Sequence, residues 1–409
     1  MSTPLQGIRV VELSTFVAGP VTARLLGDMG ATVIKVEAPG GDGWRGTGTS
    51  YLPRFAENEN PVFDIYNSGK QHISLNLKTP EGKDAMHRLL EQADVFVTNT
   101  RPAALKRLGF DYDTIKERYP ALIYAMVLGY GEAGPDAHKP AFDTTAFWSR
   151  SGFLRDMSVK HEKYAPVTAP SSVGDTATAY LLMGEICAAL YRRSRTGTGD
   201  FVSSTLYHNG IFCMGTMAIV TQPPFGRTYP MNRVDAGVPG GNYECADGEW
   251  IFFAMGNPAI NRPKFHRIIG HPELDTDPRF QSGATWANRY EYYEYFRKGF
   301  LTKTADEWVK IADEEDLPLV RMAHFKDIST DEQAWANGFL EHVTFGSGNT
   351  DIMPSSPIEM RSAQVPPTRP APAVGADTAK ILLSLGYSEE QVQAMIATGA
   401  AVAAKEGKA

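Results

Sequence analysis

Cysteine is scarce in this chain. Only Cys187, Cys213 and Cys245 occur among 409 residues, an odd number at wide spacing, and no C-x-x-C pair is present. These features argue against a disulfide framework and against a zinc knuckle. We therefore expect a metal-free protein of a reducing compartment, the cytoplasm.

Long apolar runs and an excess of positive charge are also missing. No uninterrupted apolar stretch approaches the ~20 residues that cross a bilayer, and the start of the chain lacks the pattern of a secretory signal. With 40 basic and 47 acidic residues, the net charge of −7 argues against nucleic acid as a partner. A phosphorylated small molecule remains compatible, because a few local Lys and Arg residues suffice to bind it.

The composition is that of an ordinary globular protein, with 43% hydrophobic and 21% charged residues. In the first half, short β-branched runs alternate with helical patterns. Strands separated by helices predict a mostly parallel sheet covered on both faces, so the expected class is α/β with a large Rossmann-like domain. The expected strands are 8–13, 31–37, 72–77, 94–99 and 122–128, with helices over 17–29 and 79–93.

Two further helical patterns follow, and the chain then changes character. A hairpin around Asp247-Gly248 and aromatic-rich helices predict a smaller α+β domain, and Pro-rich residues 354–372 predict extended chain. Thr304 with Glu307, and Ser388 with Gln391, have capping-box spacing. The two helices are expected over 175–193 and 204–221. The expected domains are a large α/β domain (1–222), a linker (223–241), a small α+β domain (242–325), a return crossover (326–375) and C-terminal helices packed on the large domain (376–409).

One motif suggests a nucleotide. Gly129–Gly134 matches G-x-G-x-x-G and follows an expected strand. A dinucleotide site also needs a helix directly after the glycines, whose N-terminus holds the pyrophosphate. Pro135 and Pro140 follow instead, which is loop composition. We therefore reject nicotinamide or flavin binding here and expect a turn whose backbone closely approaches a ligand.

Asp175 stands at the start of the longest core-type helix of the first half. A structural interpretation is sufficient, because Ser172 and Asp175 have capping-box spacing and an acidic first-turn residue is favoured by the helix dipole. A catalytic interpretation uses the same geometry. The helix start would keep the carboxylate ionised for nucleophilic attack, and Gly174 would leave room for a substrate. Composition does not choose between the two.

Several segments, in shared order and spacing, resemble the class III coenzyme A transferases, the formyl-CoA transferase and carnitine CoA-transferase family. The likeness is strongest over residues 5–210. The segments that carry it are Leu5-x-Gly7-Ile-Arg-Val-Val-Glu-Leu13, Ala18-Gly19-Pro20, Gly30-Ala31-x-Val33-Ile34-Lys35-Val-Glu37, Lys78-Thr79-Pro80-Glu81-Gly82, Gly174-Asp175 and Thr196-Gly197-Thr198-Gly199.

The resemblance implies site residues, position by position. Asp175 matches the catalytic aspartate, and Asp143 matches an acidic position near the active site. Contacts to CoA are implied for Val17 and Ala18 in the turn after the first strand, and for Leu75 and Lys78 along the adenine and ribose. They are also implied for Asn99, Thr100 and Arg101 in a loop at the pantetheine and phosphates, and for Arg107 as a phosphate-binding arginine. Each has a plainer alternative as helix core or solvated charge.

Within the family, the chain looks most similar to members that act on 2-hydroxy acids in amino-acid fermentation, such as phenyllactate or 2-hydroxyisocaproate. The segments that suggest this are 141–147, 229–233 and 331–337. The resemblance implies transfer of CoA from an acyl-CoA to a carboxylic acid through an aspartyl-CoA thioester. It also implies a CoA thioester as substrate, no tightly bound cofactor, no metal, no membrane partner and an interlocked homodimer.

Two departures from the family pattern bear on the substrate. Where some members carry an arginine after the second strand, Ala38 stands here, so Arg45 is a candidate to hold the adenosine end. The polyglycine loop of oxalate-type members is also absent, which argues against formyl or oxalyl transfer. Only Gly237, Gly240 and Gly241 remain near its place.

Phe142 stands where the α-methylacyl-CoA racemase of this fold uses a histidine to move a proton, and phenylalanine cannot do so. A CoA-thioester racemase or epimerase remains a second hypothesis, a nucleotide-linked oxidoreductase a remote one, and a non-catalytic acyl-CoA-binding protein a third. Aromatic and Met residues suggest an apolar substrate pocket, with plain core as the alternative. These are Phe142, Phe147, Trp148, Phe212 and Met214.

Overall fold

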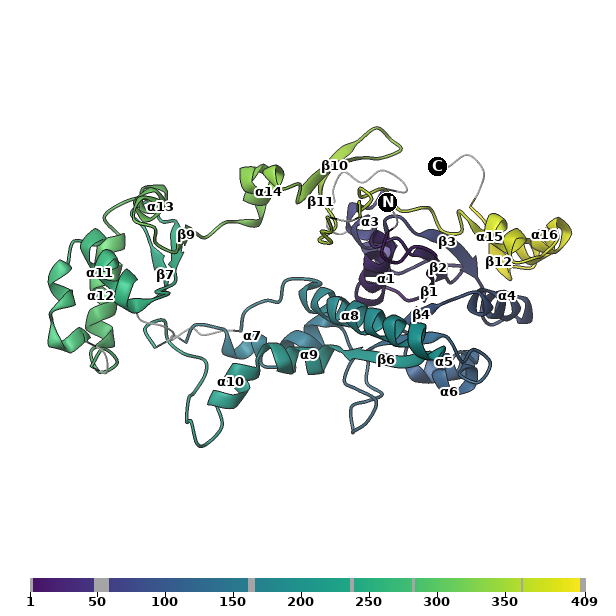
Figure 1. Cartoon of the computed structure of the whole chain (residues 1–409), viewed down its shortest axis with the longest axis horizontal. Helices are drawn as coiled ribbons and strands as arrows, with labels where there is room; N and C mark the ends of the chain where they lie inside the picture. Colours follow the sequence, from purple (N-terminus) through teal and green to yellow (C-terminus); the bar gives the residue numbers. More distant parts are fainter. Residues whose placement is uncertain are drawn as a thin grey trace. The chain divides into compact units, whose positions relative to one another are not determined.

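The computed structural model describes residues 3–47, 59–160, 166–235, 239–281, 284–361 and 363–404. They form two compact units, coloured along the sequence in Figure 1. The first unit comprises 1–153, 169–218 and 331–409, and the second comprises 154–168 and 219–330. Residues 154–168, expected in the large domain, group with the second unit, where the Lys160 amide donates to the Met231 carbonyl at 3.1 Å.

A seven-stranded sheet forms the centre of the first unit, in the order β12-β3-β2-β1-β4-β5-β6. Neighbouring strands are parallel, except that β12 runs antiparallel to β3. The order 3-2-1-4-5-6 is that of doubly wound folds, so the predicted α/β class with a mostly parallel sheet is confirmed. The strands are β1 (Arg9–Leu13), β2 (Thr32–Glu37), β3 (Gln71–Leu75), β4 (Val95–Thr98), β5 (Ile123–Leu128), β6 (Asp200–Thr205) and β12 (Ala401–Val402).

Helices cover both faces of this sheet, and β5 shows why. Its residues Ile123 and Ala125 belong to the same apolar cluster as residues of α1 and α8, whereas Tyr124 and Met126 belong to the cluster of α4 and α5. A strand that is apolar at every position can only be buried between two layers. The helices of the first unit are α1 (Ala18–Asp28), α2 (Trp44–Thr47), α3 (Pro61–Asn67), α4 (Pro80–Glu91), α5 (Pro102–Leu108), α6 (Tyr112–Ile115), the π-helix η2 (Asp143–Ser149), α8 (Val173–Thr196), α9 (Leu206–Cys213), α14 (Glu332–Ala336), α15 (Thr378–Ser384) and α16 (Glu389–Ala397), with α7 (Phe153–Asp156) and α10 (Gly215–Val220) where the units divide.

The direction of chain connection reverses between β1 and β4. The chain leaves β1 through α1 to reach β2 on one side, and it leaves β4 through α5 to reach β5 on the other. In open parallel sheets, ligands bind in the crevice outside the carboxyl ends of the strands at such a switch point. The segments to examine are therefore Ser14–Ala18 after β1 and Asn99–Arg101 after β4.

Helix α8 carries Asp175 in its first turn. It ends at Gly197, which has φ +72°, so the predicted helix with a glycine stop is confirmed. The predicted helix over 204–221 is wrong in its first part, because β6 runs to Thr205 before α9 and α10 follow. The short β-branched run there completes the sheet through six parallel pairings with β5, which outweigh the local helical pattern.

The second unit is built on a three-stranded antiparallel sheet in the order β7-β8-β9. The predicted hairpin around Asp247-Gly248 is confirmed, since Glu244 pairs with Trp250. So is the capping box of Thr304 and Glu307. Its elements are β7 (Gly241–Glu244), β8 (Trp250–Phe253), α11 (Pro258–Ile268), η3 (Pro272–Asp275), η4 (Pro278–Phe280), α12 (Arg289–Phe300), α13 (Ala305–Glu314), β9 (Leu319–Arg321) and η5 (Phe325–Thr330).

The chain returns to the first unit through a hairpin that the sequence did not reveal, β10 (Leu340–Thr344) with β11 (Thr350–Pro354). Residues 355–361 and 363–372 then run without helix or strand, as the Pro-rich composition predicts. The capping box of Ser388 and Gln391 at α16 is confirmed.

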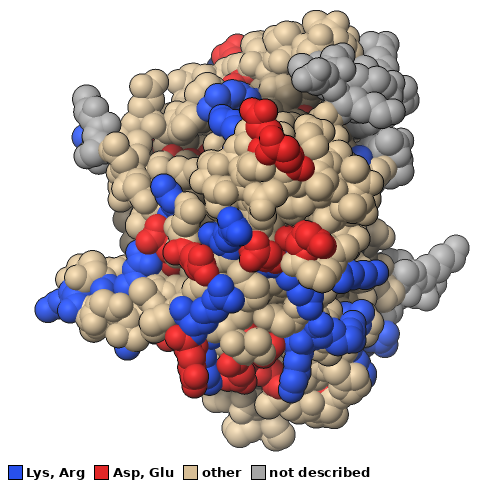
Figure 2. Space-filling view, turned by 90° about the vertical axis from the view of Figure 1, so that its right-hand side faces the viewer, with Lys and Arg blue, Asp and Glu red and all other residues tan. Residues whose placement is uncertain are grey.

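Within the described residues, no helix is long and apolar enough to cross a membrane, and no group of three or more His, Cys, Asp or Glu side chains could hold a metal ion. Figure 2 shows the face of the first unit that carries α4, with Lys and Arg side chains interspersed among Asp and Glu. Several charged side chains of the first unit are paired, including Arg88 with Asp84 and Arg118 with Glu91. A nucleic-acid-binding face is instead continuously basic.

Candidate active site

A cavity of about 440 Å³ opens at the carboxyl ends of β1 and β4, at the switch point of the sheet. The turn after β1, the loop after β4 and the segment between β5 and η2 line it, together with Asp175 and Leu206. The structure thus brings together most of the residues singled out from the sequence. These are Val17, Ala18, Asn99, Thr100, Arg101 and Asp175.

The Asp175 side chain is half-buried at this cavity. Burial, and then the charge of the neighbouring Asp143 carboxylate, raise the pKa of Asp175 to about 7. At neutral pH the carboxyl is therefore close to half ionised, and its ionised form is more basic than an ordinary aspartate. A strongly shifted pKa in a cleft is typical of a functional site.

Asp143 caps the helix that carries Asp175. Its Oδ1 accepts the backbone N–H of Asp175 at 3.0 Å. Burial raises the pKa of Asp143, and the amides of Asp175, Gly174 and Ser172 partly offset that rise. The capping box expected between Ser172 and Asp175 is wrong, since Ser172 has φ +71° and makes no side-chain cap. A carboxylate from another segment takes its place.

This arrangement corrects two expectations about Asp175. The helix start does not keep its carboxyl ionised, because the first-turn amides are directed at Asp143, whose charge opposes ionisation of Asp175. Nor does Gly174 leave room for a substrate. A Cβ at Gly174 would lie 2.3 Å from the Phe147 ring and 2.4 Å from Asp143 Oδ1, so the missing side chain admits protein groups.

The turn after β1 forms one wall of the cavity. Val17 and Ala18 line the cavity. The two residues are also only 2% and 3% exposed and belong to apolar clusters of the first unit, as the helix-core alternative predicts. Phe16 has φ +65°, a conformation that aromatic residues rarely adopt. No described side chain caps the start of α1, and its first amides lie next to the cavity.

The loop after β4 also lines the cavity and is bonded to the turn after β1. The Asn99 amide is engaged with the protein itself, since its Oδ1 accepts from the Thr15 N–H at 3.0 Å and its Nδ2 donates to the Thr15 carbonyl at 2.7 Å. The Thr100 hydroxyl donates to the Leu13 carbonyl at 3.3 Å. Arg101 is exposed and forms no ion pair with any residue that the structure describes, so its guanidinium can bind an anion.

The remaining residues singled out for CoA do not line this cavity. Leu75 is 1% exposed in the core between the sheet and α4, and Lys78 and Arg107 lie on the surface. Arg45 is committed elsewhere: its guanidinium pairs with Glu37 at 2.7 Å and donates to the Pro372 carbonyl at 2.9 Å. That engagement gives no support to the expected role of Arg45 at the adenosine end.

Of the aromatic and Met residues expected at a pocket, only Phe142 lines this cavity. Its ring packs edge to face on Phe16 at 5.8 Å. Phe147 and Trp148 pack with Leu206 in a separate cluster, as the plain-core alternative predicts. Phe212 in α9 is exposed, and Met214, which directly follows α9, is half-buried.

Sequence reasoning missed Phe16 and Lys139, which also line the cavity. Phe16 falls inside the turn that the resemblance had marked through its neighbours, but nothing in the sequence announces a left-handed aromatic residue. Lys139 falls in the stretch after the glycine motif for which the sequence indicates only a loop, and Lys139 Nζ pairs with Asp136 at 2.5 Å.

The glycine motif 129–134 takes the expected form. It follows β5 and continues as turns up to η2, without a helix directly after it. Gly129 lines the cavity, and a Cβ there would lie 2.2 Å from the Ala141 Cβ. Gly237 of the reduced glycine loop lies outside the described residues.

A model of CoA-transferase family III matches residues 5–378. The chain belongs to this family. It is therefore a class III CoA-transferase, as its motifs suggested, and enzymes of this kind use CoA thioesters as substrates.

Relatives and solved structures agree with the assignment. The chain is 39% identical to the (R)-2-hydroxy-4-methylpentanoate CoA-transferase of Clostridioides difficile, over 95% of this chain and 97% of that protein. It is 34% identical to the cinnamoyl-CoA:phenyllactate CoA-transferase of Clostridium sporogenes, over 95% and 94%. The structure of Rv3272 from Mycobacterium tuberculosis superposes with a TM-score of 0.81 at 27% identity, covering 93% of this chain and 99% of that one. A CAIB/BAIF family protein from Brucella suis gives 0.78 at 27%, covering 94% and 100%.

The first prediction concerns the coupling of the two carboxyls. Asp143→Asn removes a negative charge beside Asp175 while keeping an oxygen that can accept the helix amide, so the pKa of Asp175 should fall from about 7 toward the ordinary aspartate value. The carboxyl carbon shift of labelled Asp175, followed by NMR against pH and assigned with Asp175→Asn, measures it. An unchanged pKa would show that Asp143 does not act on Asp175.

Proposed function

We propose that this transferase moves CoA from an acyl-CoA to a 2-hydroxy acid, such as 2-hydroxyisocaproate or phenyllactate, through a covalent thioester on Asp175. The observation that carries the proposal is a basic carboxyl, with its pKa raised to about 7, lining a cavity at the switch point of the sheet. Two relatives named for acids of this class, at 39% and 34% identity, support the proposal that the substrate is a 2-hydroxy acid.

The proposed chemistry is a series of acyl exchanges. The Asp175 carboxylate attacks the thioester carbonyl of the donor, the C–S bond breaks, and a mixed anhydride and CoA thiolate form. The thiolate attacks the aspartyl carbonyl, which releases the donor acid and leaves an aspartyl-CoA thioester. The acceptor carboxylate then repeats both steps in reverse order. Each step exchanges one activated acyl group for another, so the sequence balances without ATP.

The raised pKa of Asp175 suits this chemistry. A carboxylate that burial and Asp143 make more basic is a better nucleophile once ionised, and its ionised fraction at neutral pH stays substantial. The amides at the start of α8 face Asp143. We therefore assign stabilisation of the oxyanion to backbone N–H groups at the start of α1, at Val17 and Ala18, which no described side chain caps. A well-placed donor of this kind contributes ~3–4 kcal/mol to the transition state.

The same cavity suggests how CoA binds. Val17 and Ala18 would contact the thiol end, and Thr100 and Arg101 the pantetheine and phosphates, with Arg101 exposed and without an ion-pair partner among the described residues. Asn99 would act by holding the Thr15 backbone. Contacts of Leu75, Lys78 and Arg107 with the adenosine end remain part of the proposal, at positions outside this cavity.

A racemase or epimerase is the second candidate, and it is less well supported. Proton transfer at the carbon next to a thioester needs a general base, and the ring of Phe142 at the cavity cannot serve. Exchange of deuterium into an acyl-CoA in the absence of a second acid would favour this alternative.

Activity tests the proposal directly. Wild-type protein should transfer CoA from a panel of acyl-CoA donors to 2-hydroxy acids, followed by mass spectrometry, and Asp175→Asn should lose at least ~1000-fold. Asp94→Asn, at the opposite end of the sheet where Asp94 pairs with Arg193, is the matched control and should retain activity. Near-wild-type transfer by Asp175→Asn would refute the mechanism.

We also propose a cytoplasmic, interlocked homodimer. Large apolar side chains on α8 and α9 are exposed in the single chain, among them Tyr191 at 67% and Phe212 at 81%, and a monomer would leave them in water. Sedimentation equilibrium should give twice the chain mass, and Phe212→Glu should weaken the assembly. A monomeric wild-type protein would contradict this proposal.

A further inference from the structure

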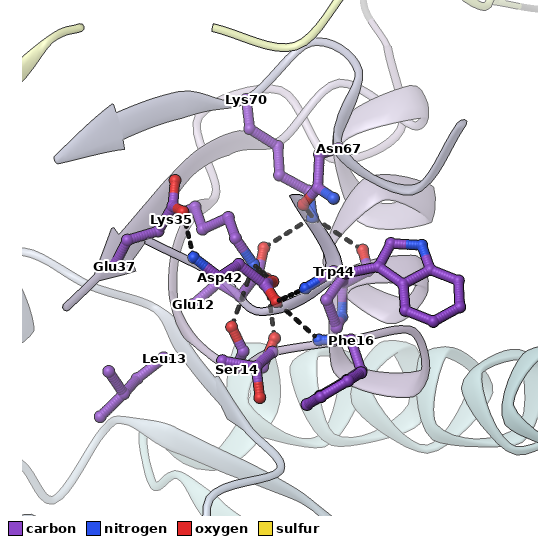
Figure 3. Close-up of polar contacts among 12 residues, drawn as sticks. Glu12, Leu13, Ser14, Phe16, Lys35, Glu37, Asp42, Trp44, Asn67 and Lys70 are labelled. Atoms are coloured by element: carbon purple, nitrogen blue, oxygen red, sulfur yellow. Dashed lines mark hydrogen bonds and ion pairs between the residues drawn. The ribbon is translucent and has the colours of Figure 1, made fainter. Parts of the chain in front are cut away.

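A buried ionic cluster lies against the turn after β1 (Figure 3). We call Glu12, Lys35, Asp42 and Lys70 the Lys35 cluster. Lys35 Nζ lies 2.8 Å from Glu12 Oε1 and 3.0 Å from Asp42 Oδ2, and Lys70 Nζ lies 2.7 Å from Glu12 Oε2. None of the four side chains is more than 1% exposed. Two basic and two acidic side chains therefore meet out of contact with water, and burial lowers the pKa of Lys70 to about 7.

The opposite charges in the cluster shift the pKa values of Lys35 and Glu12. Burial alone would lower the pKa of Lys35, but the charges of Glu12 and Asp42 raise it overall. Burial would raise the pKa of Glu12, and Lys35 and Lys70 instead lower it to about 2. Removing one charge from such a cluster leaves another buried without its partner, which is strongly unfavourable.

The cluster is attached to the cavity wall through backbone groups. Lys35 Nζ donates to the Ser14 carbonyl at 3.0 Å, and Asp42 Oδ1 accepts the Phe16 N–H at 3.0 Å (Figure 3). Between them, Asn99 binds both the N–H and the carbonyl of Thr15. Four successive backbone groups of the turn are thus held by side chains from other segments.

Such support is needed because Phe16 has φ +65°. A left-handed aromatic residue is strained and persists only where its surroundings determine it. Asp42 supplies this support through two hydrogen bonds, the first of them to the Phe16 N–H. Its Oδ1 also accepts the Trp44 N–H at 3.0 Å, and this fixes the loop whose Gly43 lies beside the Phe16 ring, where a Cβ would lie 3.4 Å from the ring.

The Phe16 ring is what the turn presents to the cavity. It contacts Phe142 edge to face at 5.8 Å and Trp44 at 6.0 Å, and Phe16, Phe142 and Asp175 line the same cavity. An acyl group bonded to Asp175 would therefore meet an apolar aromatic wall whose position depends on the Phe16 backbone.

We propose that Asp42 is a positioning residue that sets acyl-group preference: held by Lys35, it fixes Phe16 beside Asp175 so that the cavity favours bulky apolar acyl groups over acetyl. This inference rests on the proposed function. Asp42 touches no substrate and acts through the Phe16 amide and through the loop behind the ring.

The test compares two donors, 4-methylpentanoyl-CoA and acetyl-CoA, in the full-length protein with one fixed acceptor. Asn at position 42 has one oxygen for two sets of donors, Lys35 Nζ on one side and the Phe16 and Trp44 amides on the other, so its NH2 group faces a donor in either orientation. Asp42→Asn should therefore reduce the ratio of the kcat/KM values for the two acyl-CoAs about tenfold, in the range that apolar pockets discriminate by single carbons, and Phe16→Ala should do the same. In the Phe16→Ala background, Asp42→Asn should leave the ratio unchanged. Asp64→Asn is the matched control, because Asp64 as a whole residue is 4% exposed against 3% for the whole of Asp42, accepts the Ala371 N–H and does not line the cavity.

Equal losses for both donors in Asp42→Asn would overturn the inference, since a merely structural role lowers both alike. An effect of Asp42→Asn on the ratio that persists in the Phe16→Ala background would do so as well. Should Asp42→Asn fail to fold, Asp42→Glu keeps the charge that pairs with Lys35 and shifts the carboxylate by one methylene relative to the Phe16 N–H, so the same fall in the ratio is expected and an unchanged ratio overturns the inference. If wild-type protein transfers from neither donor, the proposed function itself fails, which separates the two results.

Discussion

The ionisation of Asp175 is set first by burial and then by its contact with Asp143, whose carboxylate accepts the Asp175 backbone N–H. This bond uses donors at the start of α8 that would otherwise stabilise an Asp175 anion, and it brings a second negative charge close by. Both consequences favour the protonated form of Asp175. A residue type that usually ionises near pH 4 in this way has its pKa raised to about 7, which suits the acyl transfer proposed for it.

The fold explains why the cavity forms where it does. Doubly wound sheets leave a crevice where the direction of connection reverses, here between β1 and β4. The sheet and its two helical layers supply rigidity through ordinary apolar packing. The locally unfavourable features lie at the edge of the crevice. They are the left-handed Phe16, the buried Lys35 and Lys70 attached to its turn, and the raised pKa values of Asp143 and Asp175. Functional sites often hold such locally unfavourable features, compensated elsewhere.

Sequence patterns were sufficient for the sheet and for the position of Asp175. The apolar runs of β1, β2, β4 and β5 and the glycine after α8 have local causes, and local causes can be read from sequence. The strand β6 could not be found in this way, since only its pairing with β5 makes it a strand. Family motifs led to the turn after β1 and the loop after β4, through Val17, Ala18 and Arg101.

The environment of Asp175 was beyond such reasoning for a physical reason. Its cap comes from Asp143, 32 positions earlier, and the room beside Gly174 is filled by Phe147. The support of Phe16 comes from Asp42, in a stretch whose composition indicates only a loop. Contacts between segments distant in sequence leave no local pattern, so ionisation and side-chain placement at the site required the structure.

The most direct measurement is capture of the covalent intermediate. The protein is incubated with an acyl-CoA and borohydride, digested, and its peptides are analysed by mass spectrometry. A reactive Asp175 thioester predicts reduction of that carboxyl to the alcohol, dependent on acyl-CoA, with other aspartates and glutamates unmodified. An unmodified Asp175 peptide from protein that still transfers CoA would contradict the account.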